Sequence, residues 1–244
     1  MKRITAYFVY ILLNTVAASA QYLHVLELFT YDGCASCILA NRKIKRLHDE
    51  GYFEKNGILQ LTYHVDFEAS DGFTDSLNSE FNRQRLLHYK NRGLVDGLYT
   101  PVMVLDGAFA FPAAKLSVID SLLRVSKTST KREFPIINNT HVVVEDDSLV
   151  ITSSFNDAFA LFSEVEVLSI LVKKEDRQHI LSGENSGAMR YDVNAVFAAI
   201  LAQNDVCKLS TKAISGNLNQ WQLILLKTHR SSGEIIGFDT YQLH

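Results

Sequence analysis

Hydrophobic and polar positions in the first half of the chain follow two different periods. Short, mostly apolar runs at 23–29 and 58–67 predict buried strands. Between them, apolar residues recur every three or four positions through 34–50, which is typical of one face of a helix. A further helical segment covers 76–93 and ends at a glycine. Helices alternating with strands predict an α/β layer structure.

The same region closes with two strands and a helix. Residues 99–111 are mainly apolar around Asp106–Gly107, a dipeptide typical of a hairpin turn. Pro112 then opens a helical segment, where proline is tolerated in the first turn. Residues 21–127 are therefore predicted to form one α/β domain with helices packed on a mixed sheet.

The second half has a different character. Residues 128–139 are polar and contain Pro135, and they predict a linker. Residues 140–244 contain short β-type runs separated by turn signals, which predict a β-sandwich-like domain. Within it, 191–203 fits both a helical and an alternating strand pattern, so its structure stays open.

The N-terminus has the organisation of a secretory signal peptide. Lys2 and Arg3 precede an apolar run, and the small residues of 18–20 form a cleavage site after Ala20. An uncleaved membrane anchor is the alternative, but the run contains Asn14 and is shorter than the ~20 residues that span a bilayer. Residues 1–20 therefore predict export to the periplasm or the extracellular space, with no membrane span after cleavage.

Composition and charge exclude several classes of protein. The chain has 244 residues, of which 47% are hydrophobic and 21% charged, as in an ordinary globular protein. A net charge of −3 provides no basic field for nucleic acid. Three cysteines are too few for a dense disulfide scaffold, so the fold must depend on an apolar core.

Cys34 and Cys37 form a C-x-x-C motif at the predicted start of the first helix. The unpaired amides and the dipole of a helix N-terminus stabilise a thiolate and can lower the pKa of a cysteine there. Cys34 is then the candidate attacking group in thiol–disulfide exchange, and Cys37, about one turn further, would resolve the mixed disulfide. Strand, turn, C-x-x-C and helix in succession are more specific than the motif alone.

Thr100–Pro101 is a second candidate feature. A proline at this position can hold a cis peptide bond, which is rare for other residues. The alternative is an ordinary proline at the start of a strand.

Several segments resemble the secreted thioredoxin-like family known as domain of unknown function 1223, and these are "LELFTYDGCASC", "YHVDF", "SEFNRQRLLHY", "LYTPVMVLDG", "RYDVNAVFAAI" and "WQLILLKTHRSSGEIIGF". The resemblance covers about 23–243 and implies a thioredoxin fold that carries the cysteine pair, without a settled substrate. In such a fold Pro101 faces the pair, and Thr100 and Pro101 line the substrate groove. The chain departs from the family pattern at Ile38 and Leu39, where prolines are usual.

Other residues have weaker functional interpretations. Glu27, in the first strand, is a candidate proton relay, and its alternative is a carboxylate paired with a basic group. His64 and Asp66 alternate on one strand face but form no four-ligand set, so no metal is predicted. Cys207 and Trp221 are expected in the core.

Two functional hypotheses follow. In the first, the protein is an exported thiol–disulfide oxidoreductase that acts on a protein or small thiol and is recycled by a redox partner, without an external cofactor. In the second, it is a non-enzymatic binding or envelope-structural protein in which the Cys34–Cys37 disulfide only fixes a turn. The β-rich region has no catalytic signature, and a shared fold does not decide between the two.

Overall fold

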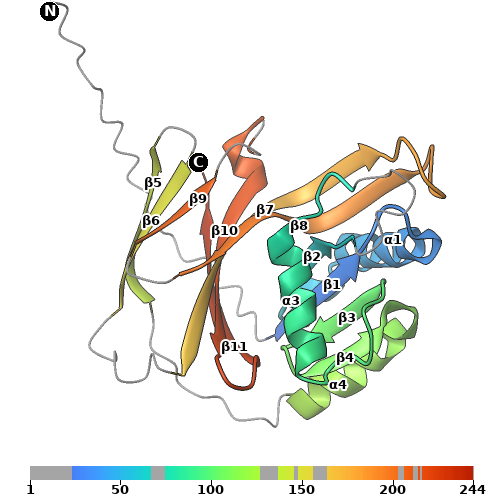
Figure 1. The fold of residues 1–244 in the computed structure, drawn as a ribbon, viewed down its shortest axis with the longest axis horizontal. Helices are drawn as coiled ribbons and strands as arrows, with labels where there is room; N and C mark the ends of the chain where they lie inside the picture. Colours follow the sequence, from blue (N-terminus) through green and yellow to red (C-terminus); the bar gives the residue numbers. More distant parts are fainter. Residues whose placement is uncertain are drawn as a thin grey trace, which may run out of the picture.

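An eight-stranded mixed sheet runs through most of the protein (Figure 1). The computed structural model describes residues 24–66, 75–126, 137–145, 148–155, 164–202, 206–210, 214 and 216–243. The predicted signal peptide, 1–20, and residues 128–136 of the predicted linker lie outside the described residues. Among the described helices, none is both long and apolar enough to cross a membrane.

The first half alternates strands and helices in the predicted order. Its strands are β1 (His24–Thr30), β2 (Ile58–His64), β3 (Val102–Leu105) and β4 (Phe109–Pro112). Its helices are α1 (Ala35–Asp49), α2 (Tyr52–Lys55), α3 (Glu80–Asn91), the 3₁₀ helix η1 (Ala113–Val118) and α4 (Ile119–Ser126). The hairpin turn falls at Asp106–Gly107, and both residues have positive φ, as the sequence pattern predicted.

The second half consists mainly of strands. They are β5 (Ile137–Glu145), β6 (Ser148–Phe155), β7 (Val165–His179), β8 (Met189–Leu201), β9 (Val206–Ser210), β10 (Trp221–His229) and β11 (Ile235–Gln242), with the 3₁₀ helix η3 (Leu218–Gln220) before β10. β5, β6 and β9 form a separate three-stranded sheet.

The large sheet joins strands from both halves of the chain. Its order is β11-β10-β7-β8-β2-β1-β3-β4, with β2 parallel to both β1 and β8 and all other neighbours antiparallel. The structure thus differs from the sequence prediction in one respect: β7, β8, β10 and β11 continue the sheet of the first half instead of standing apart from it. The predicted domain boundaries themselves stay a prediction.

The ambiguous segment 191–203 is largely strand β8, and a bulge explains its pattern. Leu171 pairs with Ala198, whereas Val172 pairs with Val196, so Phe197 is an extra residue on β8. An extra residue shifts the alternation of side chains by one position. The apolar spacing along β8 therefore mimics a helix.

Helices cover the sheet on both faces. On one face, Leu26 and Leu28 of β1 pack with Ala40 and Ile44 of α1 in a core that also includes Leu123 of α4. On the other face, residues of β1, β2, β7 and β10 form a core with α3; they are Val25, Phe29, Leu61, Tyr63, Ile170, Ile224, Leu86 and Tyr89. Because side chains alternate across a strand, Glu27 lies on the α3 face.

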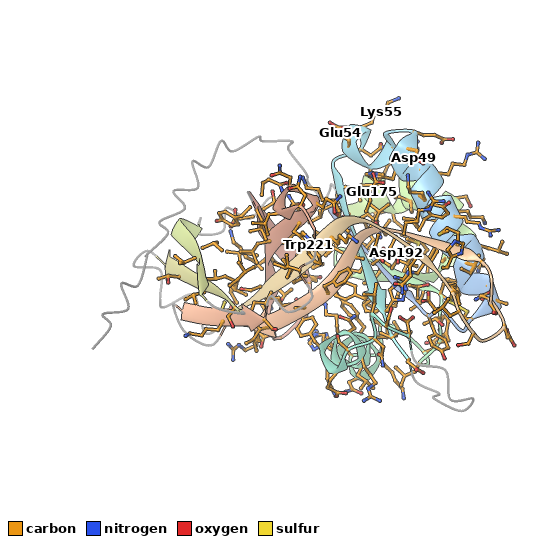
Figure 2. The ribbon with its side chains drawn as sticks, turned by 90° about the horizontal axis from the view of Figure 1, so that it is seen from above. Asp49, Glu54, Lys55, Glu175, Asp192 and Trp221 are labelled. Atoms are coloured by element: carbon orange, nitrogen blue, oxygen red, sulfur yellow. A yellow bond between two sulfur atoms is a disulfide. The ribbon has the colours of Figure 1, made fainter. Side chains whose placement is uncertain are left out.

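The three-stranded sheet packs against β7 and β10, at the end of the molecule far from α1 (Figure 1). Leu149, Ile151 and Leu209 meet Leu223 and Leu225 there, so the packing is that of a small sandwich. Trp221 is fully buried among these strands (Figure 2), and Cys207 is 8% exposed. Both residues thus belong to the core, as predicted.

Two loops meet where the β3–β4 turn contacts the β10–β11 hairpin. The Ile235 amide donates to the Asp106 carbonyl oxygen at 2.9 Å. Gly107 has φ +64, and a Cβ there would clash with the Gly233 carbonyl oxygen, whereas Gly51, with φ +67, has open space around it. Glycine at 107 is therefore required by both backbone conformation and close approach.

Gly107→Ala is expected to destabilise the protein more than Gly51→Ala. The Gly51 variant meets only the left-handed backbone penalty, about 1–2 kcal/mol, and the Gly107 variant adds an overpacking cost of about 1–3 kcal/mol. The free energies of unfolding in urea measure both. Equal losses of unfolding free energy in the two variants would show that the β3–β4 turn moves away from the β10–β11 hairpin without cost.

Candidate active site

The Cys34–Cys37 pair is a disulfide at the start of α1, with the two Cα atoms 5.3 Å apart. Cys34 is the N-cap of the helix, as the sequence predicted for the first cysteine. It is partly exposed, whereas Cys37 is only 1% exposed. Cys34 is thus more exposed to solvent than Cys37, an asymmetry that suits thiol–disulfide exchange.

The surroundings of Cys34 combine a hydroxyl group and a carbonyl group. Ser36 Oγ lies 3.2 Å from Cys34 Sγ, and because a disulfide sulfur has no proton, the hydroxyl is the donor. The Thr100 carbonyl oxygen lies 3.6 Å from the same sulfur. The Thr100–Pro101 peptide bond is cis, as predicted, and both residues are partly exposed. The structure therefore brings Thr100 to Cys34 across 66 positions of sequence.

Glu27 has a different environment from the one that a proton relay needs. It is fully buried, and Arg85 donates to it from Nε at 3.0 Å and from Nη2 at 3.2 Å. The Tyr89 hydroxyl also donates to it. These partners come from α3, on the sheet face opposite α1. The relay interpretation is therefore not supported, and the alternative of a paired carboxylate describes Glu27.

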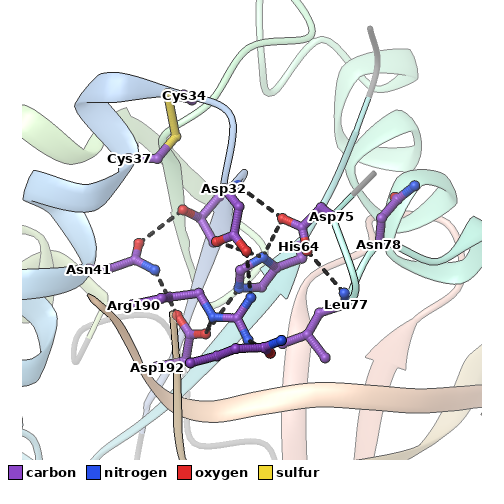
Figure 3. Close-up of polar contacts among 12 residues, drawn as sticks. Asp32, Cys34, Cys37, Asn41, His64, Asp75, Leu77, Asn78, Arg190 and Asp192 are labelled. Atoms are coloured by element: carbon purple, nitrogen blue, oxygen red, sulfur yellow. Dashed lines mark hydrogen bonds and ion pairs between the residues drawn. A yellow bond between two sulfur atoms is a disulfide. The ribbon is translucent and has the colours of Figure 1, made fainter. Parts of the chain in front are cut away.

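A buried ionic network lies beside the disulfide (Figure 3). At its centre, His64 of β2 places Nδ1 2.7 Å from Asp75 and Nε2 3.1 Å from Asp192 of β8. Asn41 of α1 donates to the other Asp192 oxygen at 2.6 Å and accepts from Thr30 Oγ1 at 2.9 Å. The network thus connects α1 to β1, β2 and β8.

Arg190 of β8 is the second cation of the network. Nη1 lies 2.6 Å from Asp32, and Nη2 lies 2.6 Å from Asp176 of β7. Nε is 2.7 Å from Asp192, as an ion pair rather than an aligned hydrogen bond. The guanidinium is fully buried, so three carboxylates supply its compensating charge. Figure 2 contrasts Asp192, in the interior, with Asp49, Glu54 and Lys55 at the surface.

The network shifts the pKa values of its members. Burial alone would lower the pKa of His64, but the Asp75 and Asp192 carboxylates outweigh it and raise that pKa to about 10. Burial alone would raise the pKa of Asp75, but the His64 charge and its hydrogen bond lower it to about 2. Burial raises the pKa of Asp32, because the favourable charges of His64 and Arg190 only partly compensate.

The same cluster contains the described residues that come nearest to a metal site. Asp32, His64 and Asp75 offer ligand atoms within 4.8 Å of one another. Both ring nitrogens of His64 already face carboxylates, however: Nδ1 lies against Asp75 and Nε2 against Asp192. In this conformation neither ring nitrogen is free to bind a metal, so we assign no metal to the cluster.

The network was missed by sequence reasoning, although a signal for it exists. Arg190 and Asp192 stand at alternate positions of a segment that is otherwise mostly apolar, and alternate residues share one face of a strand. Asp32 stands two residues before Cys34. The pattern could have predicted a charged pair inside the sheet, but not its proximity to the cysteines.

These features define a mixed α/β protein with a disulfide at a helix N-terminus beside a buried ionic network. Residues 25–224 match the family described as protein of unknown function (DUF1223), and the chain belongs to this family. A crystal structure of a protein from Agrobacterium tumefaciens has a similar fold, with a TM-score of 0.58 and 22% identity over 89% of this chain and 93% of that chain. Among curated proteins, none matches the sequence.

Proposed function

We propose that the protein is an exported thiol–disulfide oxidoreductase with a thioredoxin-like arrangement in its first half. The observation that carries this proposal is the asymmetric disulfide: Cys34 is accessible at the N-cap of α1, and Cys37 is buried behind it. A disulfide that only fixed a turn would need neither the exposure of Cys34 nor the polar groups around its sulfur. Ser36 and the Thr100 carbonyl supply those groups.

Exchange would proceed through a mixed disulfide. A substrate thiolate attacks Cys34 Sγ, a new S–S bond forms, and the Cys34–Cys37 bond breaks with Cys37 as the leaving thiolate, which takes up a proton. A second substrate thiolate then attacks the sulfur of the first substrate, and Cys34 leaves. The substrate is oxidised to a disulfide by two electrons and the cysteine pair is reduced. The reverse sequence reduces a substrate disulfide.

The start of α1 would stabilise the thiolate of Cys34. Helix N-termini carry roughly half a positive charge on their unpaired amides, and the Ser36 hydroxyl can donate to a thiolate as it does to the disulfide sulfur. Both interactions favour the leaving form of Cys34 over its thiol. Thr100 and Pro101 would line the groove for the substrate, which is a protein or small thiol.

Export rests on the predicted signal peptide at 1–20. In a periplasmic or extracellular location disulfides persist, so a redox partner must recycle the pair. The proposal needs no other cofactor.

The decisive experiment measures the reduction potential of the Cys34–Cys37 pair and the pKa of the Cys34 thiol. We expect a potential above about −300 mV, because structural disulfides typically have potentials below this value. We also expect the pKa of the Cys34 thiol to lie below its ordinary value. Cys37→Ser should accumulate mixed disulfides with exported proteins. Cys207→Ser, which removes the buried third cysteine, is the matched control and should trap none.

The opposite result has a clear meaning. A pair that resists reduction, with an ordinary thiol pKa and no trapped partner, would make the disulfide structural. The protein would then be a binding or structural protein of the cell envelope.

A further inference from the structure

The loop between β7 and β8 reaches the turn that carries the cysteine pair. Asn185, in this loop, donates from Nδ2 to the Asp32 carbonyl oxygen at 2.7 Å and to the Cys34 carbonyl oxygen at 2.8 Å. These contacts join positions 153 and 151 residues apart in the sequence. A single amide group from the second half thus holds both ends of the Asp32–Cys34 turn.

The hairpin also binds a side chain of the same turn. Arg190, five positions after Asn185, binds the Asp32 carboxylate from Nη1 at 2.6 Å. The other contacts of the turn are local or come from the first half: the Cys34 amide donates to the Tyr31 carbonyl oxygen at 3.1 Å, and the Asp32 amide donates to Asp75 at 2.9 Å. The β7–β8 hairpin therefore holds the turn through two side chains, which contact its first and last residues, Asp32 and Cys34.

We propose that Asn185 is a positioning residue of the Cys34–Cys37 redox pair, and that the β7–β8 hairpin thereby controls the reactivity of Cys34. This inference rests on the proposed oxidoreductase function. It assigns a role in that function to the second half of the chain, which has no catalytic motif of its own.

The physical link runs through the Cys34 carbonyl group. Its oxygen accepts from the Cys37 amide at 3.0 Å, the hydrogen bond that begins α1, and also from Asn185. Fixing this carbonyl fixes the first peptide groups of the helix, whose free amides stabilise a thiolate at Cys34. Without Asn185 the first turn is less restrained, and these amides are less well aligned with the sulfur.

Charge near the turn adds to this restraint. The ionisable groups that act on Asp32 from the elements packed around it are Arg190 and Asp192 of β8, His64 of β2, and Asp75. Asn185 is uncharged, so replacing it changes the geometry of the turn without changing this set. Uncharged replacements at this position therefore isolate positioning from charge.

The test compares Asn185→Ala with Ser186→Ala in the full-length chain. Ser186 is the matched control, because it lies in the same loop and, among the described residues, its hydroxyl donates within that loop, to the Leu181 carbonyl oxygen at 3.2 Å. We expect Asn185→Ala to slow alkylation of reduced Cys34 at neutral pH by about tenfold, the fall in thiolate fraction that follows a rise of about one unit in the thiol pKa. The pH profile of alkylation should move to higher pH, and Ser186→Ala should leave both unchanged.

A second variant tests the same two hydrogen bonds with a different side chain. Asn185→Leu keeps much of the volume of the side chain and adds no charge but cannot donate to the two carbonyl oxygens, so it should shift the profile in the same direction as Asn185→Ala. Circular dichroism and thermal unfolding establish that each variant is folded before its reactivity is compared.

The outcomes separate this inference from the proposed function. If wild-type Cys34 has an ordinary thiol pKa and exchanges no disulfides, the oxidoreductase function fails. If the wild type is active and Asn185→Ala has the wild-type pH profile and rate, with only a lower melting temperature, the positioning role alone is overturned.

Discussion

Replacing Arg190 by methionine should lower the free energy of unfolding by about 3–5 kcal/mol, the cost of removing one partner from a buried ion pair. The guanidinium is buried and contacts Asp32, Asp176 and Asp192. Methionine fills much of the same volume but leaves these carboxylates without their cation. Urea denaturation of the wild type and the variant measures the difference.

The matched control is the same substitution on the surface. Arg46 pairs with Glu50 at 2.7 Å, but its side chain is 79% exposed. Because water solvates both charges, Arg46→Met should leave the free energy of unfolding nearly unchanged. Similar losses for both variants would mean that the network contributes no more than a surface pair.

Alkaline pH should destabilise the protein well before tyrosines ionise. The pKa of His64 rises from 6.5 in the unfolded chain to about 10 in the folded protein, because Asp75 and Asp192 outweigh the opposing effect of burial. A raised folded-state pKa stabilises the protein fully below pH 6.5, and this contribution is lost as the pH rises toward 10. Between pH 6.5 and 9 the loss should reach roughly 3 kcal/mol, at about 1.36 kcal/mol per pH unit.

At acid pH, two carboxyl groups have pKa shifts of opposite sign. The pKa of Asp75 is lowered to about 2, so its contribution is present above pH 3.8 and is lost as the pH falls toward 2. The pKa of Asp32 is raised by burial, so its ionisation above pH 3.8 opposes folding. The loss of stability at alkaline pH is therefore the clearer test of the network.

Urea denaturation across pH 6.5–9 checks this prediction, with His64→Gln as the comparison. The upper limit restricts the contribution of Cys207: burial raises the pKa of this thiol, so its ionisation in the unfolded chain lowers stability once the pH passes the ordinary value of 9.0. The variant should be less stable at pH 6.5, and its stability should vary little over this interval. A wild-type stability that is constant over the interval would show that His64 is not protonated in the folded protein.

The local parts of this protein were readable from its sequence. A helix N-terminus is determined by a few neighbouring residues, so the position of Cys34 at the mouth of α1 and that of Cys37 in its first turn followed from one short segment. The Asp106–Gly107 turn was equally local, because turn preferences act over two to four residues. The cis Thr100–Pro101 bond was not, because the local residues fit an ordinary proline at the start of a strand equally well and only the cysteine pair upstream favoured the cis form. Membership of the family followed from the same motifs.

Only the tertiary structure decided which distant residues surround the cysteine pair. Strand alternation placed Glu27 on the α3 face, but its partners Arg85 and Tyr89 were fixed by packing. The pairing of β8 with β2 brought Arg190 and Asp192 beside His64, and the β7–β8 loop brought Asn185 to Cys34. Periodicity gives the faces of a strand but not its neighbours in a sheet, and for that reason the network and the role of the second half could not be predicted from the chain alone.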